Sequence, residues 1–135
     1  MADECEDITT QEELSICCRW LVNSKPEEHF MTILHILPCD AESITEKLES
    51  FIATNKLDYR ELVGQGYDGA AVFAGVNTGV QARMRVNSAH SMYIHCACHK
   101  LQLASIQAAD KVPEIKKVFG MMGNLWKLFP KKQKL

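Results

Sequence analysis

Apolar and polar residues alternate along residues 14–22, which is the pattern of a β-strand with one buried face. The alternate apolar positions are Leu14, Ile16, Cys18, Trp20 and Val22. A turn-forming cluster, Asn23-Ser24-Lys25-Pro26, comes next. Residues 29–37 then form a second run that is rich in β-formers and apolar on both sides. We therefore expect an antiparallel hairpin built from these two runs.

A helical pattern replaces the alternation after Pro38. Ser43 and Glu46 have the spacing of a capping box, in which the two side chains satisfy free amides at a helix start. Apolar residues follow at intervals of three and four, which places them on one side of a helix. The pattern predicts an amphipathic helix over Ala41–Asn55, followed by a strand that begins at Leu62.

After that strand, the sequence predicts a helix, a short strand and two further helices. Val76–Arg85 is a helix candidate with Val80 and Met84 facing inward, and Ser91–His95 is a short buried strand. The chain is then helical over Cys98–Phe129, with Pro113 starting a new helix at its first turn. One stripe of that last helix carries Ile115, Val118, Phe119, Met122, Leu125 and Phe129.

The resulting order is strand, strand, helix, strand, helix, strand, helix, helix. This order predicts an α/β fold with a mixed sheet flanked by helices, in which the later strands are parallel because helices separate them. The chain has 135 residues, 47% of them apolar, which fits one domain over residues 1–135. Within it we expect an acidic loop and hairpin at Asp3–Leu37, with the loop at Asp3–Glu13, and a core unit at Leu62–His99.

The charges are distributed unevenly along the chain. Residues 1–78 carry five basic and fifteen acidic side chains, whereas residues 79–135 carry ten basic and two acidic ones, although the net charge is only −2. A basic half is able to face phosphates, and ordinary solvated helix faces explain the same pattern. The candidates for nucleic-acid contacts are Arg83, Arg85, Lys116, Lys117, Lys127, Lys131 and Lys132.

The six cysteines lie inside apolar runs, and the N-terminal residues lack the pattern of a signal peptide. Reduced thiols in an intracellular protein are the better interpretation. The longest apolar run is far shorter than the roughly 18 residues of a membrane helix. We therefore expect no membrane partner.

Asp68 stands in Gly66-Tyr67-Asp68-Gly69, directly after a buried strand and before small residues that suit a helix start. A carboxylate at the carboxyl end of a strand in an α/β sheet is well placed to bind a metal ion. A simple Asp-Gly turn explains the same residues. The acidic residues around Asp3 offer further oxygen ligands for Mg²⁺, or form a solvated loop.

Residues 95–99, His-Cys-Ala-Cys-His, invite comparison with a zinc site. Structural zinc normally takes its ligands from two separated pairs, and here all candidates fall within five residues. We therefore expect no structural zinc. The alternative is that Cys96 packs as a small apolar group and His99 forms a hydrogen bond near a helix start.

Four motifs taken together resemble the catalytic core of hAT-superfamily transposases and of proteins domesticated from them, including the zinc-finger MYM-type group. The motifs are DECED at Asp3–Asp7, CCRW at Cys17–Trp20, YDGAA at Tyr67–Ala71 and CACHKLQL at Cys96–Leu103. They occur in the family's order and span nearly the whole chain. The resemblance implies a ribonuclease-H-like fold.

By this resemblance Asp3 and Asp68 match the first and second catalytic aspartates, and Cys96 and His99 match the C-x-x-H pair that supports the active site. The two aspartates would share Mg²⁺ or Mn²⁺, which activates water or a 3′-hydroxyl for attack on a phosphodiester. The family's third carboxylate has no counterpart before the last residue, Leu135, and the family's first strand would precede Asp3. The resemblance therefore implies an incomplete ribonuclease-H-like domain.

Three hypotheses follow for the function. The first is a truncated, domesticated hAT-like fragment without independent catalysis, located in the cell interior or nucleus and binding DNA or protein, or without a function. The second is a divalent-metal-dependent strand transferase or nuclease half-site that another chain completes. The third is a binding module that uses the basic half for phosphates, with the apolar stripe Ile115–Phe129 as a protein-binding surface.

Overall fold

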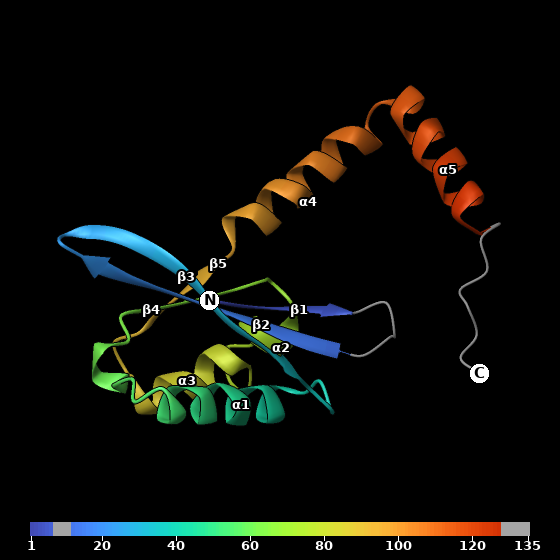
Figure 1. The fold of residues 1–135 in the computed structure, drawn as a ribbon. Helices are drawn as coiled ribbons and strands as arrows, with labels where there is room; N and C mark the ends of the chain where they lie inside the picture. The colour runs from blue at the N-terminus through green and yellow to red at the C-terminus, as the bar shows by residue number, and fades with distance from the viewer. Residues whose placement is uncertain (7–11, 128–135) are drawn as a thin grey trace. The chain divides into compact units, whose positions relative to one another are not determined.

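The computed structural model describes residues 1–6 and 12–127 and shows an α/β fold of small sheets flanked by helices (Figure 1). The chain divides into two compact units, which we call unit 1 (residues 1–96) and unit 2 (residues 97–135). The prediction of a single domain over residues 1–135 stays a prediction.

Unit 1 begins with three antiparallel strands in the order β1-β2-β3. They are β1 (Ala2–Glu6), β2 (Glu12–Val22) and β3 (Lys25–His35). The predicted hairpin is confirmed, with Asn23 and Ser24 at positive φ in the tight turn. Lys25 and Pro26 were predicted in the turn but lie in β3, where Pro26 pairs with Leu21.

The expected acidic loop over Asp3–Glu13 is wrong at both ends, because Asp3 lies in β1 and Glu12 and Glu13 lie in β2. Asp3 pairs with Ser15 of β2, whose hydroxyl donates a hydrogen bond of 3.0 Å to the Asp3 carbonyl oxygen. Ala2 is buried while Asp3 is exposed, so this strand alternates between two environments. The expectation that the first strand precedes Asp3 is also corrected, and residues 7–11 lie outside the described residues.

Helix α1 (Ala41–Thr54) confirms the predicted amphipathic helix, but its N-cap differs from the prediction. The Asp40 carboxylate accepts a hydrogen bond of 2.8 Å from the Ser43 amide, so Asp40, and not Ser43, caps the helix. This bond and the local amides hold the pKa of Asp40 below its usual value. The predicted capping box of Ser43 and Glu46 is therefore wrong, because Asp40 already satisfies the amide.

A short 3₁₀ turn, η1 (Tyr59–Glu61), leads into the second, two-stranded sheet of β4 (Gly64–Tyr67) and β5 (Met92–His95). These strands are parallel, as predicted, because helices α2 (Ala71–Ala74) and α3 (Val80–Asn87) connect them. Three corrections concern the expected elements. The strand predicted to begin at Leu62 begins at Gly64, because Leu62 closes the 3₁₀ turn. The helix predicted over Val76–Arg85 starts only at Val80, and the strand predicted to be buried exposes Met92 and Ile94.

The core of unit 1 lies between one side of the strands and helices α1 and α3, which lie on the same side of the strands in Figure 1, and Phe73 of α2 belongs to it. Its best-buried side chains include Leu14 of β2, Ile44 of α1 and Phe73 of α2, each with no exposed surface. Val80 and Met84 of α3 join them, as predicted. We call this side of the strands the closed face.

The ladder between β2 and β3 contains a bulge at Met31 of β3, because Ile16 pairs with Thr32 and Cys17 pairs with Phe30. Leu14 and Ile16 are buried as predicted, but Trp20 beyond the bulge is 41% exposed. Its indole stacks on the imidazole of His29 with 4.3 Å between ring centroids. The buried residues of β2 therefore lie in the first half of the strand, and the face predicted to be buried along its whole length is corrected.

Unit 2 contains α4 (Ala97–Asp110) and α5 (Pro113–Lys127). The start of the second helix at Pro113 is confirmed. None of the described side chains of these two helices is buried. In the described part of the chain, no helix has both the length and the apolar character that crossing a bilayer requires.

Candidate functional site

The best-defined candidate site is the turn that follows β4 and carries Asp68. The Asp68 carboxylate oxygen Oδ1 accepts a hydrogen bond of 2.9 Å from the Ala70 amide, which shapes the turn. The carbonyl oxygen of Asp68 accepts a hydrogen bond of 2.7 Å from the Tyr93 hydroxyl of β5. Because two elements hold this turn, the position of the aspartate is fixed by the fold.

Gly69 has a steric reason to be glycine. A Cβ atom at this position would lie 2.5 Å from Cε1 of His95, because the imidazole packs directly against the turn. His95 and Tyr93 both belong to β5, so this strand supports the Asp68 turn at two points. Sequence reasoning missed these two supports, although the strand's alternation placed both side chains on one face.

An aromatic cluster lies beneath the turn. Tyr67 stacks on Phe73 at 5.0 Å and on Tyr93 at 6.3 Å between ring centroids. Burial raises the pKa of Tyr67, with Tyr59 adding to the shift. Burial, followed by the charge of Asp68, raises the pKa of Tyr93. Tyr93 is therefore a neutral phenol near pH 7, as its role as hydrogen-bond donor to Asp68 requires.

The structure places β1 beside β4, and thus the strand of Asp3 beside the strand that leads to Asp68. A Cβ atom on Gly66 would lie 3.0 Å from Cγ of Met1, so the Met1 side chain packs directly against the backbone of Gly66. Asp3 comes two residues after Met1, and Asp68 comes two residues after Gly66. The side chain of Asp3 is exposed and that of Asp68 is half-buried.

The donor set fits the hard divalent cation that the resemblance implies, since both candidates are carboxylates and Mg²⁺ and Mn²⁺ prefer oxygen ligands. Asp68 uses Oδ1 within its own turn, which leaves Oδ2 for a cation. Among the described side chains, no group of three or more His, Cys, Asp or Glu residues is arranged to hold a metal ion. The two-aspartate hypothesis requires no such group and stays a prediction.

Cys96 is held at the end of β5, where its amide donates a hydrogen bond of 2.7 Å to the carbonyl oxygen of Tyr67. The Cys96 side chain is half-buried in unit 1. His99 lies on α4 in unit 2 and is also half-buried. The supporting role of this pair stays a prediction.

The basic candidates differ in their surroundings. Arg83 donates from Nε to the carbonyl oxygen of Thr78 at 3.0 Å, and its Nη2 lies 3.9 Å from a carboxylate oxygen of Glu42. Arg85, Lys116, Lys117 and Lys127 are exposed or nearly so, and the salt bridges found among the described residues do not include them. Lys131, Lys132 and the stripe residue Phe129 lie outside the described residues.

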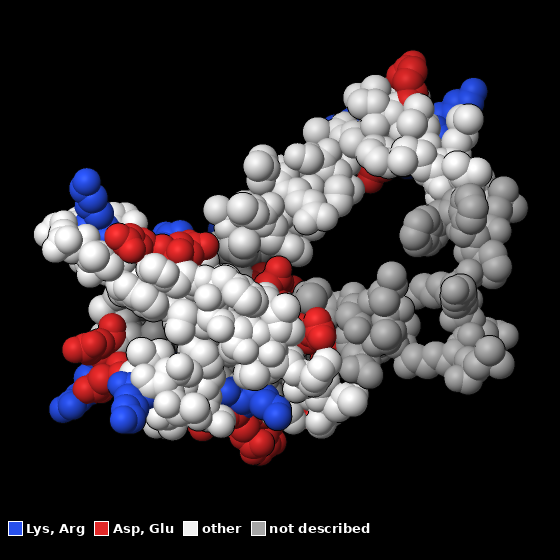
Figure 2. All heavy atoms as spheres, in the orientation of Figure 1, with Lys and Arg blue, Asp and Glu red and all other residues white. Residues whose placement is uncertain are grey.

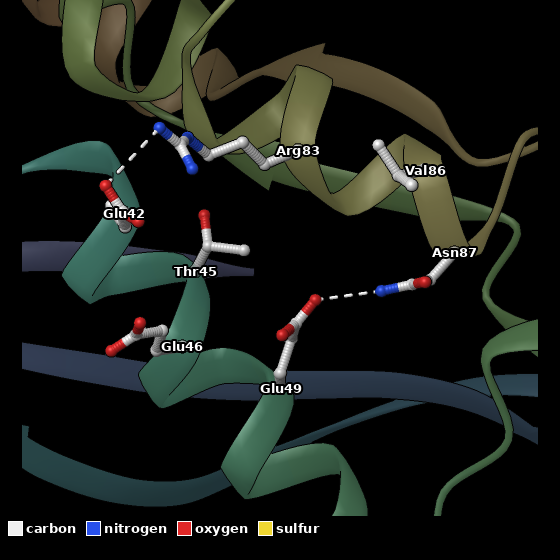
Figure 3. A pocket seen from close by; sticks show the side chains of 7 residues that line it. All are labelled: Glu42, Thr45, Glu46, Glu49, Arg83, Val86 and Asn87. Carbon is white, nitrogen blue, oxygen red and sulfur yellow. Dashed lines mark hydrogen bonds and ion pairs between the residues drawn. The ribbon is translucent and has the colours of Figure 1, made fainter.

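A hollow of about 320 Å³ lies between α1 and α3 (Figure 3). A hydrogen bond of 2.8 Å from Asn87 to Glu49 and the ion pair of Arg83 with Glu42 join the two helices beside the hollow. Figure 2 shows acidic and basic side chains interspersed on this side of unit 1. The polar groups of the hollow therefore tie α3 to α1, and we assign it no ligand.

Comparison with known proteins identifies the family of the chain. No solved structure matches it. A family model described as DUF4371, "ZMYM1/FAM200, RNase-like domain", matches residues 1–79, which is more than half of the chain and includes both Asp3 and Asp68. The observed α/β fold agrees with an RNase-like domain. The chain therefore belongs to this RNase-like, domesticated transposase-like family.

Proposed function

We propose that the chain derives from a transposase of the hAT type and acts as a nucleic-acid-binding module that does not cut nucleic acid by itself. Membership in a domesticated transposase-like family supports this origin. The four motifs from Asp3 to Leu103 support the hAT type, because they follow the order of that superfamily.

The observation that carries the binding proposal is the state of the lysines on α5. Lys116, Lys117 and Lys127 are exposed, and the described salt bridges leave all three ammonium groups to solvent. A lysine without a carboxylate partner keeps its full charge for a phosphate, whereas Arg83 is already engaged by Glu42. Helix α5 is therefore the best candidate for the phosphate contacts.

The first experiment measures binding and cutting on the same oligonucleotide. Fluorescence anisotropy with a duplex of about 20 base pairs gives the affinity, and gel analysis after incubation with Mn²⁺ gives any nicking. We expect binding without nicking. Nicking by the purified chain that disappears in Asp68→Asn would overturn the non-cutting part of the proposal.

A matched pair of variants tests the role of α5. The double substitution Lys116→Glu/Lys117→Glu should weaken binding by at least about tenfold, since it reverses two phosphate contacts. The control Lys25→Glu/Lys47→Glu makes the same charge change at exposed lysines of unit 1 and should leave the affinity within about twofold. Equal losses in both variants would show an effect of net charge only.

One observation favours a second candidate, the metal-dependent half-site completed by another chain. Asp3 and Asp68 each follow the close approach of β1 to β4, and the Asp68 turn is fixed by Tyr93 and by the packing of His95 on Gly69. The bound cation would supply a Lewis acid for phosphodiester chemistry. The chain's own part is to hold the two carboxylates, with Asp68 oriented by its turn.

Isothermal titration with Mn²⁺ tests this candidate. Asp3→Asn and Asp68→Asn should each reduce the affinity at least about tenfold, because each removes a charged oxygen ligand. Asp110→Asn on α4 is the control and should not change the titration. Unchanged affinity in both site variants removes the half-site from consideration.

A further inference from the structure

The strands of unit 1 are covered by helices on the closed face, and their opposite face is open. The register identifies the open face. Ile33 lies opposite Ser15 and Phe30 lies opposite Cys17, and these two β2 positions share a face because they are two residues apart. Met1 exchanges two hydrogen bonds with Cys17, of 2.7 and 2.8 Å, and therefore lies on the same face.

The open face continues across β4 and β5. A Cβ atom on Gly66 would lie 3.0 Å from the side chain of Met1, so the Met1 side chain covers the face of β4 to which a side chain at position 66 would point. Met92 pairs with Gly64 and Ile94 pairs with Gly66 in the parallel ladder, which places both side chains there too. The apolar residues of the open face are Met1, Phe30, Ile33, Met92 and Ile94, all between 47% and 67% exposed.

Helix α5 carries a matching apolar surface, which we call the α5 stripe. Its residues, spaced by three and four, are Ile115, Val118, Met122 and Leu125, between 41% and 59% exposed. The helix is about 22 Å long at 1.5 Å per residue. The three-stranded and two-stranded sheets lie next to each other through β1 and β4, and five strands spaced by about 4.8 Å span about 19 Å, so the helix fits across the face.

We propose that α5 of a second copy of this chain docks its stripe on the open face, with each copy offering its α5 to the other. The opposite net charges of the two units favour this crossed pairing, in which unit 1 of each copy contacts unit 2 of the other. Unit 1 carries seven basic and fifteen acidic side chains, and unit 2 carries eight basic and two acidic ones. Two copies of the acidic unit 1 repel each other, as do two copies of the basic unit 2, whereas unit 1 of one copy and unit 2 of the other attract each other.

The connection between the units favours a second copy as the source of the helix. Only Cys96 separates the end of β5 at His95 from the start of α4 at Ala97. The Cys96 amide is also fixed by its hydrogen bond to Tyr67. Short hinge segments of this kind favour exchange between copies over folding back within one chain. A reciprocal exchange closes as a two-fold dimer.

The lysines of α5 lie away from the stripe. An α-helix turns by about 100° per residue, and this rotation places Lys116, Lys117 and Lys127 on the side of α5 away from the stripe. Docking therefore leaves them in solvent, and this inference does not rest on the proposed binding of nucleic acid.

Light scattering of the full chain tests the dimer directly. We expect a mass of twice the 15.2 kDa of one chain at high concentration, with dissociation on dilution between about 200 and 5 µM. Ile33→Asp on the open face and Val118→Asp on the stripe should each raise the dimer dissociation constant at least about tenfold. Val86→Asp makes the same change at an 81% exposed valine of α3 and should have no effect.

Mixing the two variants identifies the geometry. In a crossed dimer, the Val118→Asp chain still offers an intact open face, and the Ile33→Asp chain still offers an intact stripe. An equimolar mixture should therefore regain dimers that neither variant forms alone. Dimers of both variants alone, a mixture that stays monomeric, or a monomeric wild-type chain would each overturn the proposal. Phe30→Asp replaces Ile33→Asp if circular dichroism shows that the latter is unfolded.

Discussion

Units 1 and 2 are stabilised in different ways. Unit 1 closes a core in which Leu14, Ile44 and Phe73 have no exposed surface. The described side chains of unit 2 include no buried one, and its longer apolar residues are exposed along α5. Burial of apolar area is the main favourable term in folding. The fold is therefore specified by unit 1, and unit 2 is the part that gains most from a binding partner.

The same contrast separates the charges. Unit 1 is acidic and pairs three of its arginines with carboxylates, Arg19 with Glu28, Arg60 with Asp58 and Arg83 with Glu42. Unit 2 is basic, and its lysines on α5 are left to solvent. Substitutions in unit 1 should therefore change stability, and substitutions in unit 2 should change binding.

The largest effect is expected for Phe73→Ala. The ring is fully buried and stacks on Tyr67, so its removal leaves a cavity and should lower the free energy of unfolding by about 3 to 5 kcal/mol. Phe119→Ala makes the same change on α5, where the ring is 60% exposed, and should cost less than about 0.5 kcal/mol. Urea unfolding of dilute protein measures both. Similar losses of unfolding free energy in the two variants would contradict the proposed difference in stabilisation between the units.

Gly69→Ala should cost about 1 to 3 kcal/mol, because the new Cβ meets the His95 ring at 2.5 Å. Gly120→Ala in α5 meets nothing within 4 Å and should be neutral or stabilise the helix by about 0.5 to 1 kcal/mol. Thermal unfolding followed by circular dichroism compares them. If the double variant Gly69→Ala/His95→Ala is as unstable as the sum of the single ones, the steric explanation is wrong.

Asp40→Ala should lower the stability of the fold through loss of the α1 cap. The pKa of Asp40 is lowered in the folded protein, so its stabilisation is present above the unfolded value of 3.8 and is lost as pH falls below it. Unfolding curves of the wild type and the variant should therefore converge as the pH falls below 3.8. Curves that stay parallel over this range contradict the assignment of the cap.

The smallest change is expected for Tyr93→Phe, which removes the hydrogen bond to the Asp68 carbonyl and should cost about 0.5 to 1.5 kcal/mol. Tyr59→Phe is the matched control, since the Tyr59 hydroxyl has no hydrogen-bond partner among the described residues. Removal of the Tyr59 hydroxyl should leave the free energy of unfolding nearly unchanged. Equal effects in chemical unfolding would mean that the Tyr93 bond does not hold the Asp68 turn.

Sequence patterns predicted the elements whose signal is local. The hairpin, α1 and the start of α5 at Pro113 follow from alternation, helical spacing and proline chemistry, and the structure contains all three. The position of Asp68 after a strand was predicted for the same reason, since glycines and a short apolar run mark the turn. These signals need no knowledge of distant contacts.

The features that sequence reasoning missed depend on partners far along the chain. Asp3 lies in a strand because β2 pairs with it, although its neighbours are acidic. Trp20 follows the same alternation as Leu14 and Ile16 and is nevertheless 41% exposed, which no local pattern indicates. The supports of the Asp68 turn, Tyr93 and His95, come from a strand some 25 residues later.

The salt dependence of duplex-DNA binding by the full chain tests the proposed function most directly. If the lysines of α5 bind phosphates, log K should fall linearly with log salt concentration, and Lys116→Glu/Lys117→Glu should make the slope shallower by about two. The Lys25→Glu/Lys47→Glu control should keep the wild-type slope. An affinity that does not change with salt, or a slope that is the same in all three proteins, would contradict the account.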